Sequence, residues 1–208
     1  MSSKTNYEEY YASEDYYWGI EPAELCYELL KLLPPGKDVK VLDIGCGEGK
    51  DAVFMAKQGY QVTAFDITKN GIAKTLKLAK ENDVKVDAFI ADINDFSIDE
   101  TFDIIYSTGT IQYLDEDKIP AFFEKVRNMT RPDGINWFNV FVDKPFIPLP
   151  PDWDIYEKLW KAGSLFTYYP DWKFERIDET IFECHSAGIP HLHCMDVLVA
   201  RKDSKTIL

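Results

Sequence analysis

The sequence is poor in cysteine and in positive charge, and each shortage excludes a class of protein. Its four cysteines form no C-x-x-C pair and are too few for a disulfide framework, so we expect reduced thiols. Lys and Arg number 23 against 36 Asp and Glu, a formal net charge of −13, which disfavours a nucleic acid or an anionic membrane as partner. The sequence has no run of about 18 apolar residues that could span a bilayer, and no signal peptide at its start. These shortages together indicate a cytoplasmic protein.

The chain divides into a short arm and one domain. Residues 1–19 are rich in Tyr, Glu and Ser, and we treat them as an N-terminal aromatic arm. Residues 20–208 are long enough for a single domain with a substantial core. The arm ends in an aromatic run that includes Trp18, which can cover a bound adenine or simply pin the arm to the core. The sequence leaves both roles open.

A glycine-rich turn organises the rest of the sequence. Residues 39–44 form a short apolar, β-branched run typical of a buried strand, and Gly45, Gly47 and Gly49 follow it. Glycine suits a strand-to-helix turn that lies against another molecule, because a Cβ would clash with that molecule or forbid positive φ. Residues 51–56 can then open a helix whose first N–H groups face the same crevice. The G-x-G-x-G spacing is one residue shorter than the dinucleotide-binding turn, which disfavours a nicotinamide-dependent oxidoreductase.

A second strand and an acidic residue follow the glycine turn. The predicted strand over residues 61–65 ends at Asp66, before a predicted helix over residues 68–81. A carboxylate in this place can accept hydrogen bonds from both hydroxyls of a ribose, as an adenosine-containing ligand requires. Asp66 can alternatively cap the helix, although Thr68 is available for that task.

Strands and helices alternate along the chain and predict an α/β fold. We expect a doubly wound, mostly parallel, seven-stranded Rossmann-like sheet with an antiparallel hairpin at its C-terminal edge. Right-handed crossovers bring Asp43, Asp66, Asp92 and either Ser107 or Thr108 to one crevice at the carboxyl ends of the strands. The further predicted strands cover residues 85–92, 101–108, 135–142, 173–184 and 192–202, and the further helices residues 22–33, 117–129 and 153–162.

A proline-rich stretch over residues 143–154 interrupts this alternation. It holds four prolines and cannot form regular helix or strand. A stiff loop next to the crevice suits a substrate wall or lid, although many such loops are only connections.

Five short stretches together carry a family resemblance: residues 16–19, 42–49, 101–105, 131–134 and 199–202. With them the chain resembles a class I S-adenosylmethionine-dependent methyltransferase along nearly its full length. Within that group it is most similar to the tellurite-resistance methyltransferase subfamily. The resemblance implies methyl transfer from S-adenosylmethionine to a small-molecule acceptor, with a chalcogen oxyanion or a thiol as the suggested class, by a monomer or homodimer. An S-adenosylmethionine-binding regulatory module without turnover is the alternative.

The resemblance also implies roles for particular residues. Gly45 and Gly47 would let the backbone approach the methionine part of the donor, and Asp43 would order the turn and the donor's amino group. Asp66 would hold the ribose, and Asp92 with the N–H of Ile93 would bind the adenine edge. The full cofactor-binding set expected is Trp18, Asp43, Gly45, Gly47, Gly49, Lys50, Asp66, Ile67, Asp92, Ile93 and Ser107.

Three members of this set have a plainer alternative. Lys50 can face the donor carboxylate or be a solvated lysine on the first helical turn. Asp92 can be an ordinary turn residue in place of an adenine contact. Ser107 can meet the methionine end or merely end its strand.

All three histidines fall between the last two predicted strands. Imidazole can take up a proton near neutral pH, or bind an oxyanion when it is protonated. The subfamily has a histidine followed by arginine in this segment, and His185 aligns with that histidine, so His185 is the expected catalytic residue. Ser186 replaces the arginine, which weakens the case for an oxyanion substrate.

The other two histidines suggest a further possibility. His191 and His193 would share one face of a strand, so a metal site is conceivable, with Cys184 and Cys194 as additional ligands. A polar hairpin tip with ordinary buried cysteines is the plainer alternative, and we predict no metal.

Overall fold

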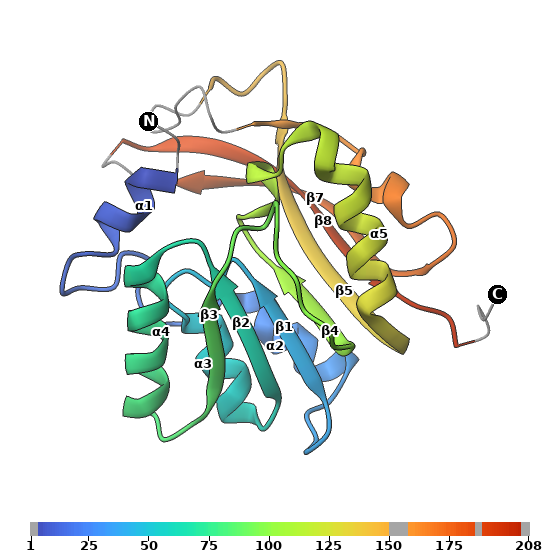
Figure 1. The fold of residues 1–208 in the computed structure, drawn as a ribbon. Helices are drawn as coiled ribbons and strands as arrows, with labels where there is room; N and C mark the ends of the chain where they lie inside the picture. The colour runs from blue at the N-terminus through green and yellow to red at the C-terminus, as the bar shows by residue number, and fades with distance from the viewer. Residues whose placement is uncertain (1–3, 150–157, 186–188, 205–208) are drawn as a thin grey trace.

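The computed structural model describes residues 4–149, 158–185 and 189–204, and places a sheet at the centre of the molecule (Figure 1). In the described residues this sheet has eight strands, seven of them in the order β3-β2-β1-β4-β5-β8-β7, with β6 paired to β5. The strands are β1 (Lys40–Ile44), β2 (Gln61–Asp66), β3 (Val86–Ile90), β4 (Phe102–Ser107), β5 (Thr130–Asp143), β6 (Trp160–Lys161), β7 (Lys173–Cys184) and β8 (His191–Arg201).

Helices cover both faces of this sheet. The α-helices are α1 (Lys4–Tyr10), α2 (Glu24–Leu32), α3 (Lys50–Gln58), α4 (Lys69–Glu81) and α5 (Ile119–Met129), and the 3-10 helices are η1 (Ile111–Tyr113), η2 (Glu116–Lys118) and η3 (Leu165–Tyr168). Leu42 packs into the core under α5, whereas Val41 packs into the core formed with α2, α3 and α4. Neighbouring strand residues therefore enter opposite cores, as the two-residue period of a strand requires. None of the helices in the described ranges combines the length and apolarity needed to cross a membrane.

The pairing confirms the predicted fold class. Strands β3, β2, β1, β4 and β5 run parallel, and β8 pairs antiparallel with both β5 and β7. The carboxyl ends of the parallel strands lie along one side of the sheet, and the segments that follow β1, β2 and β4 meet there. The antiparallel hairpin of β7 and β8 extends beyond these carboxyl ends (Figure 1).

Three differences between the predicted elements and the structure bear on the C-terminal half of the sheet. Strand β5 begins at Thr130 instead of residue 135, because Thr130 pairs with Phe102 before a register shift in the ladder to β4. The predicted helix over residues 153–162 is wrong where the structure describes it, since Trp160 and its neighbour form β6. There the open edge of β5 supplies backbone hydrogen bonds, and Trp160 packs against Phe123 with ring centroids 6.1 Å apart. Residues 153–157 lie outside the described residues, and β8 starts at His191, inside the segment expected to be a loop.

Candidate functional site

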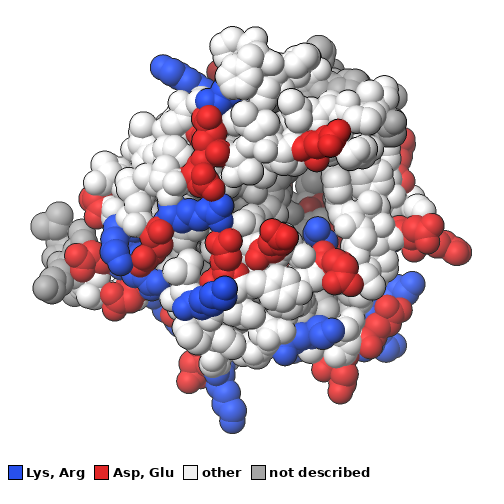
Figure 2. All heavy atoms as spheres, turned by 180° about the vertical axis from the view of Figure 1, so that it is seen from behind, with Lys and Arg blue, Asp and Glu red and all other residues white. Residues whose placement is uncertain are grey.

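A cavity of about 550 Å³ lies at the carboxyl ends of the parallel strands. The arm, the glycine turn, the loops after β2, β3 and β4, and the far ends of β5, β7 and β8 all contribute to its wall. Figure 2 shows the molecule hollowed on the face opposite to that of Figure 1, with acidic side chains near the opening. The charged residues among the described lining are five acids and one lysine: Asp43, Glu48, Asp51, Asp66, Asp92 and Lys50.

The glycine turn is tied to the end of β2 by backbone hydrogen bonds. The N–H groups of Gly45 and Cys46 donate to the carbonyl of Phe65 at 2.8 and 3.0 Å, and the N–H of Gly47 donates to Asp66 Oδ2 at 2.9 Å. Gly45 has φ +74°, and a Cβ there would lie 2.1 Å from Thr110 Oγ1. The turn therefore needs glycine at this position both for its backbone conformation and for space.

Asp43 is a buried acid with an unpaired carboxylate oxygen among the described residues. Its side chain is 2% exposed, and Oδ2 has no hydrogen-bond partner among the described residues. Burial raises the pKa of this carboxyl well above its usual range, and the nearby Asp51 and Asp66 raise it further. A buried carboxylate without a donor is costly, so the site favours a cationic or hydrogen-bonding group that would face Asp43.

Asp66 is held in place by its own neighbours. Oδ1 accepts from the N–H and hydroxyl of Thr68 at 2.9 and 2.6 Å, and Oδ2 accepts from Gly47. A carboxylate has about four lone-pair positions, so these three bonds leave about one, on Oδ2. Asp66 and Ile67 both line the cavity, but without rearrangement the carboxylate has room for one ribose hydroxyl instead of the two expected.

Four other members of the expected set also line the cavity. Asp92 and Ile93 lie at its wall, and Asp92 Oδ1 accepts from the backbone and side-chain N–H groups of Asn94 at 3.0 and 3.2 Å. Asp92 is thus a turn residue and a lining residue at once. Lys50 is half-buried at the first position of α3, and Trp18 is half-exposed, with its indole N–H donating to the hydroxyl of Tyr11 at 3.1 Å.

Three expected residues are not among the described residues that line the cavity. Gly49 caps α3 with φ +86°, and its missing Cβ makes room for Thr75 of α4. Ser107 is fully buried, and its hydroxyl donates to the carbonyl of Ile44 at 2.8 Å, which links the ends of β4 and β1. The side chain of His185 is 67% exposed and lies 3.9 Å from Glu183, and His185 is not among the described residues that line the cavity.

Sequence reasoning missed residues at both ends of the cavity. Tyr11 is 6% exposed, and its hydroxyl lies 3.0 Å from where a Cβ of Gly47 would be. Burial raises the pKa of the Tyr11 phenol, and Asp66 adds to the shift. The spacing of the arm tyrosines fits the helical period of α1 and was the available signal. At the other end Phe182 and its neighbours on β5 and β8 reach the cavity through sheet pairing, beside His193, which the sequence analysis named as a possible metal ligand.

A buried ion pair links the glycine turn to α4 and also contacts the arm. Lys74 Nζ lies 2.7 Å from Glu48 Oε1, with side-chain exposures of 12% and 2%. Glu48 Oε2 also accepts from the backbone N–H of Trp18 at 3.2 Å. Farther along the arm, Glu8 Oε2 accepts from the N–H of Lys69 at 2.7 Å, at the start of α4. These contacts join the arm, the glycine turn and α4.

We expect Lys74→Met to destabilise the protein by about 3 kcal/mol, because the Glu48 carboxylate would remain buried without its cation. Urea unfolding measures this change in the free energy of unfolding. Lys77→Met is the matched control on the same helix, since Lys77 is 63% exposed and 3.9 Å from Glu81. An exposed pair of this kind contributes about 0.5 kcal/mol or less. Equal effects of the two substitutions would contradict a structural role for the buried pair.

A mostly parallel sheet with this strand order, a glycine turn after its first strand and acids after the next two define the class I methyltransferase fold. Within this class the chain belongs to the family of tellurite resistance protein TehB, whose model matches residues 5–189.

The chain is also similar to individual proteins of known sequence or structure. A "probable S-adenosyl-L-methionine-dependent methyltransferase TehB" of Haemophilus influenzae is 28% identical over 146 residues, which are 70% of this chain and 50% of the relative. The crystal structure of TehB from Haemophilus influenzae has a TM-score of 0.80 and 25% identity, and the match covers 95% of this chain and 67% of that one. The N-methyltransferase NodS from Bradyrhizobium japonicum, in complex with S-adenosyl-L-homocysteine, shares the fold at a TM-score of 0.70 and 19% identity, over 96% and 99% of the two chains. The chain spans about half the length of the curated TehB relatives it matches.

Proposed function

We propose that this protein transfers a methyl group from S-adenosylmethionine to a small, soft acceptor, a thiol or a chalcogen oxyanion. The observation that carries the proposal is the buried Asp43 carboxylate, whose Oδ2 lacks a partner among the described residues beside the glycine turn. S-adenosylmethionine carries an ammonium and a sulfonium, so it brings positive charge to a cavity with an excess of acids. The names of the TehB relatives as probable S-adenosylmethionine-dependent methyltransferases support the same cofactor.

The residues of the cavity suit the parts of this donor. Asp43 would bind the ammonium group, and the open backbone at Gly45 and Gly47 would lie along the methionine part. Asp66 would accept from a ribose hydroxyl, and Asp92 with the N–H of Ile93 would bind the adenine edge. Lys50, the cation among the described lining residues, would face the donor carboxylate, while Ile67 and Trp18 supply apolar wall.

Catalysis would rest mainly on alignment and on exclusion of water. When bound, S-adenosylmethionine supplies an electrophilic methyl group whose transfer removes the positive charge on its sulfur. Tyr7, Tyr11 and Trp18 of the arm line the cavity, where they would cover the donor and keep water from it. At the acceptor end His193 is 5% exposed and lines the cavity, so His193, in place of His185, is the histidine that would meet the acceptor.

The charge of the cavity distinguishes this proposal from a nicotinamide-dependent oxidoreductase. A pyrophosphate would add two negative charges beside Asp43, Asp66 and Asp92, which like-charge repulsion opposes. A regulatory module that binds the donor without turnover would keep the same nucleoside end.

Isothermal calorimetry with the full chain tests the proposal. We expect S-adenosylmethionine and S-adenosylhomocysteine to bind with Kd values on the order of micromolar, and NADH to give no heat. Absence of heat with both adenosyl ligands would refute the proposal. A panel of thiol, selenite and tellurite acceptors then measures turnover, and tight donor binding with no methylated product from any of them would favour the regulatory module.

A further inference from the structure

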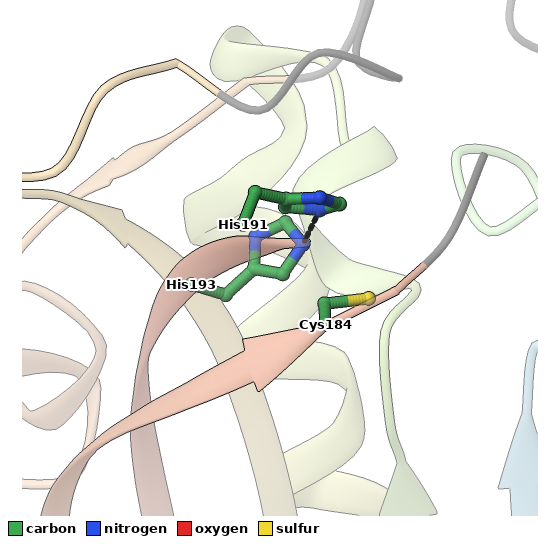
Figure 3. Close-up of side chains that lie close together, drawn as sticks. All are labelled: Cys184, His191 and His193. Carbon is green, nitrogen blue, oxygen red and sulfur yellow. Dashed lines mark hydrogen bonds between the residues drawn. The ribbon is translucent and has the colours of Figure 1, made fainter. Parts of the chain in front are cut away.

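The hairpin of β7 and β8 brings three potential metal ligands together. Cys184 pairs with His191 across the ladder, and Phe182 pairs with His193. Residues paired across an antiparallel ladder share a face with those two positions away, so all four side chains lie on one side of the hairpin. Figure 3 shows the thiol of Cys184 beside the two imidazoles, whose Nε2 atoms point toward each other. Cys184 and His193 line the large cavity, so this is the side that the acceptor would meet.

The three ligand atoms are close enough for one ion. The sulfur and the imidazole nitrogens all lie within 4.8 Å of one another, and the two Nε2 atoms are 3.0 Å apart. Tetrahedral zinc with Zn–N of about 2.0 Å and Zn–S of about 2.3 Å needs ligand atoms roughly 3.3–3.6 Å apart. Small side-chain rotations that separate the nitrogens and bring the sulfur nearer would meet this requirement.

A second contact prepares His191 for coordination. Its Nδ1 lies 2.7 Å from the carbonyl oxygen of Ile189, which accepts a hydrogen bond from the protonated Nδ1. That bond leaves the Nε2 lone pair directed at the cluster, as in zinc sites where a backbone carbonyl fixes the tautomer of a ligating histidine.

In place of the metal-free hairpin expected from the sequence, we propose that Cys184, His191 and His193 bind a zinc ion whose fourth coordination position opens into the cavity and takes a thiolate acceptor. One thiolate and two imidazoles are a donor set that zinc prefers, and three protein ligands are typical of sites that keep a position for substrate. The assignment of the acceptor rests on the proposed methyl transfer, whereas the zinc site itself does not.

Methyl transfer at this site would begin with the acceptor thiol bound to zinc. Binding to zinc lowers the pKa of the acceptor thiol, whose proton passes to solvent. A lone pair of the resulting thiolate sulfur forms the bond to the methyl carbon while the bond from that carbon to the donor sulfonium breaks. The electron pair of the broken bond stays on the donor sulfur, which becomes the neutral thioether of S-adenosylhomocysteine. The methylated acceptor is also a neutral thioether, a weaker zinc ligand, and can leave.

Zinc binding to the chelator-treated full chain tests the site. We expect equilibrium dialysis to show one zinc per chain, and both Cys184→Ser and His191→Ala to weaken binding about 100-fold. His185→Ala is the matched control, because this exposed imidazole lies outside the cluster and its loss should change nothing. With cobalt as the probe, a thiolate-to-metal charge-transfer band should appear and be lost in Cys184→Ser. No zinc binding, or equal binding by the parent chain and Cys184→Ser, would overturn the site.

Calorimetry and turnover on the same samples separate this inference from the proposed function. Both cluster variants should keep the S-adenosylhomocysteine affinity of the parent chain. Zinc binding without adenosyl binding would refute the methyl transfer but leave the metal site. Adenosyl binding without zinc binding would refute the metal site but leave the methyl transfer. For the acceptor, added zinc should raise the methylation rate of a thiol at least tenfold, and a rate unchanged by zinc would overturn the thiolate assignment.

Discussion

Asp43→Asn is expected to weaken S-adenosylmethionine binding on the order of 100-fold and, at neutral pH, to stabilise the ligand-free protein. The affinity falls because an amide replaces a charge-assisted hydrogen bond to the donor ammonium, worth about 1.5–3 kcal/mol. The ligand-free protein gains because a buried carboxylate close to Asp51 and Asp66 is removed. We expect a gain of about 1–2 kcal/mol from the removal of a buried charge whose Oδ2 lacks a partner among the described residues, or several degrees in Tm for a chain of this size.

The sign of the pH dependence follows from the raised pKa of Asp43. The folded, ligand-free chain binds this proton more tightly than the unfolded chain. Its stability therefore falls as pH rises from the ordinary carboxyl pKa toward the raised value, and is constant above that. A bound ammonium favours the carboxylate, so donor binding releases a proton and the affinity falls as pH drops below the raised pKa.

Calorimetry in buffers of different ionisation enthalpy measures that proton release, and thermal unfolding across pH measures the stability. Both pH dependences should be reduced in Asp43→Asn. Asp38→Asn removes an exposed carboxyl outside the cavity and serves as the control. If Asp43→Asn bound the donor as tightly as Asp38→Asn does, Asp43 would not be a ligand of the ammonium.

Gly45→Ala is expected to cost about 4 kcal/mol of stability and to abolish donor binding. The added Cβ would lie 2.1, 2.4 and 2.6 Å from three side-chain atoms of Thr110, in a backbone with φ +74°. Left-handed strain contributes about 1–3 kcal/mol, and the overlap contributes a similar amount. Because Gly45 donates to Phe65 at the end of β2, relief of the overlap would also displace the turn from the donor.

Urea unfolding and calorimetry with S-adenosylhomocysteine measure the two effects. Gly163→Ala separates strain from overlap, since Gly163 has φ +83° but nothing within 4 Å of its would-be Cβ. We expect this control to lose about 1–2 kcal/mol and to keep its affinity. Equal losses of stability in the two variants would show that Thr110 does not confine the turn.

The sequence was sufficient to predict which residues meet at the glycine-turn end of the cavity, because that end depends on local order. Asp43, Gly45 and Asp66 each follow directly from a strand end, and parallel pairing brings strand ends to one edge. The glycine spacing could not show that Gly49, unlike Gly45 and Gly47, does not line the cavity. Only the packing of α3 on α4 shows that Thr75 occupies the space that a Cβ of Gly49 would need.

The acceptor end could not be predicted in the same way, because it depends on the register of β7 against β8. That register pairs residues seven or more positions apart, and a shift of one position reverses every side chain. Without it, alignment favoured His185, whereas His193 and Cys184 face the cavity. Tyr11 was missed for a related reason, since its place at the glycine turn depends on how the arm folds back over α4.

The antiparallel hairpin gives this protein two separately adjustable halves. The half that would hold the nucleoside is built by parallel strands and tight turns, in which a substitution such as Gly45→Ala displaces the backbone itself. Its acceptor half is a ribbon whose inward positions, such as Phe182 and His193, can change one at a time while the backbone ladder stays intact. New substrate preferences could therefore arise in descendants of such a chain by exchange of a few hairpin side chains, with no change in how the donor is held.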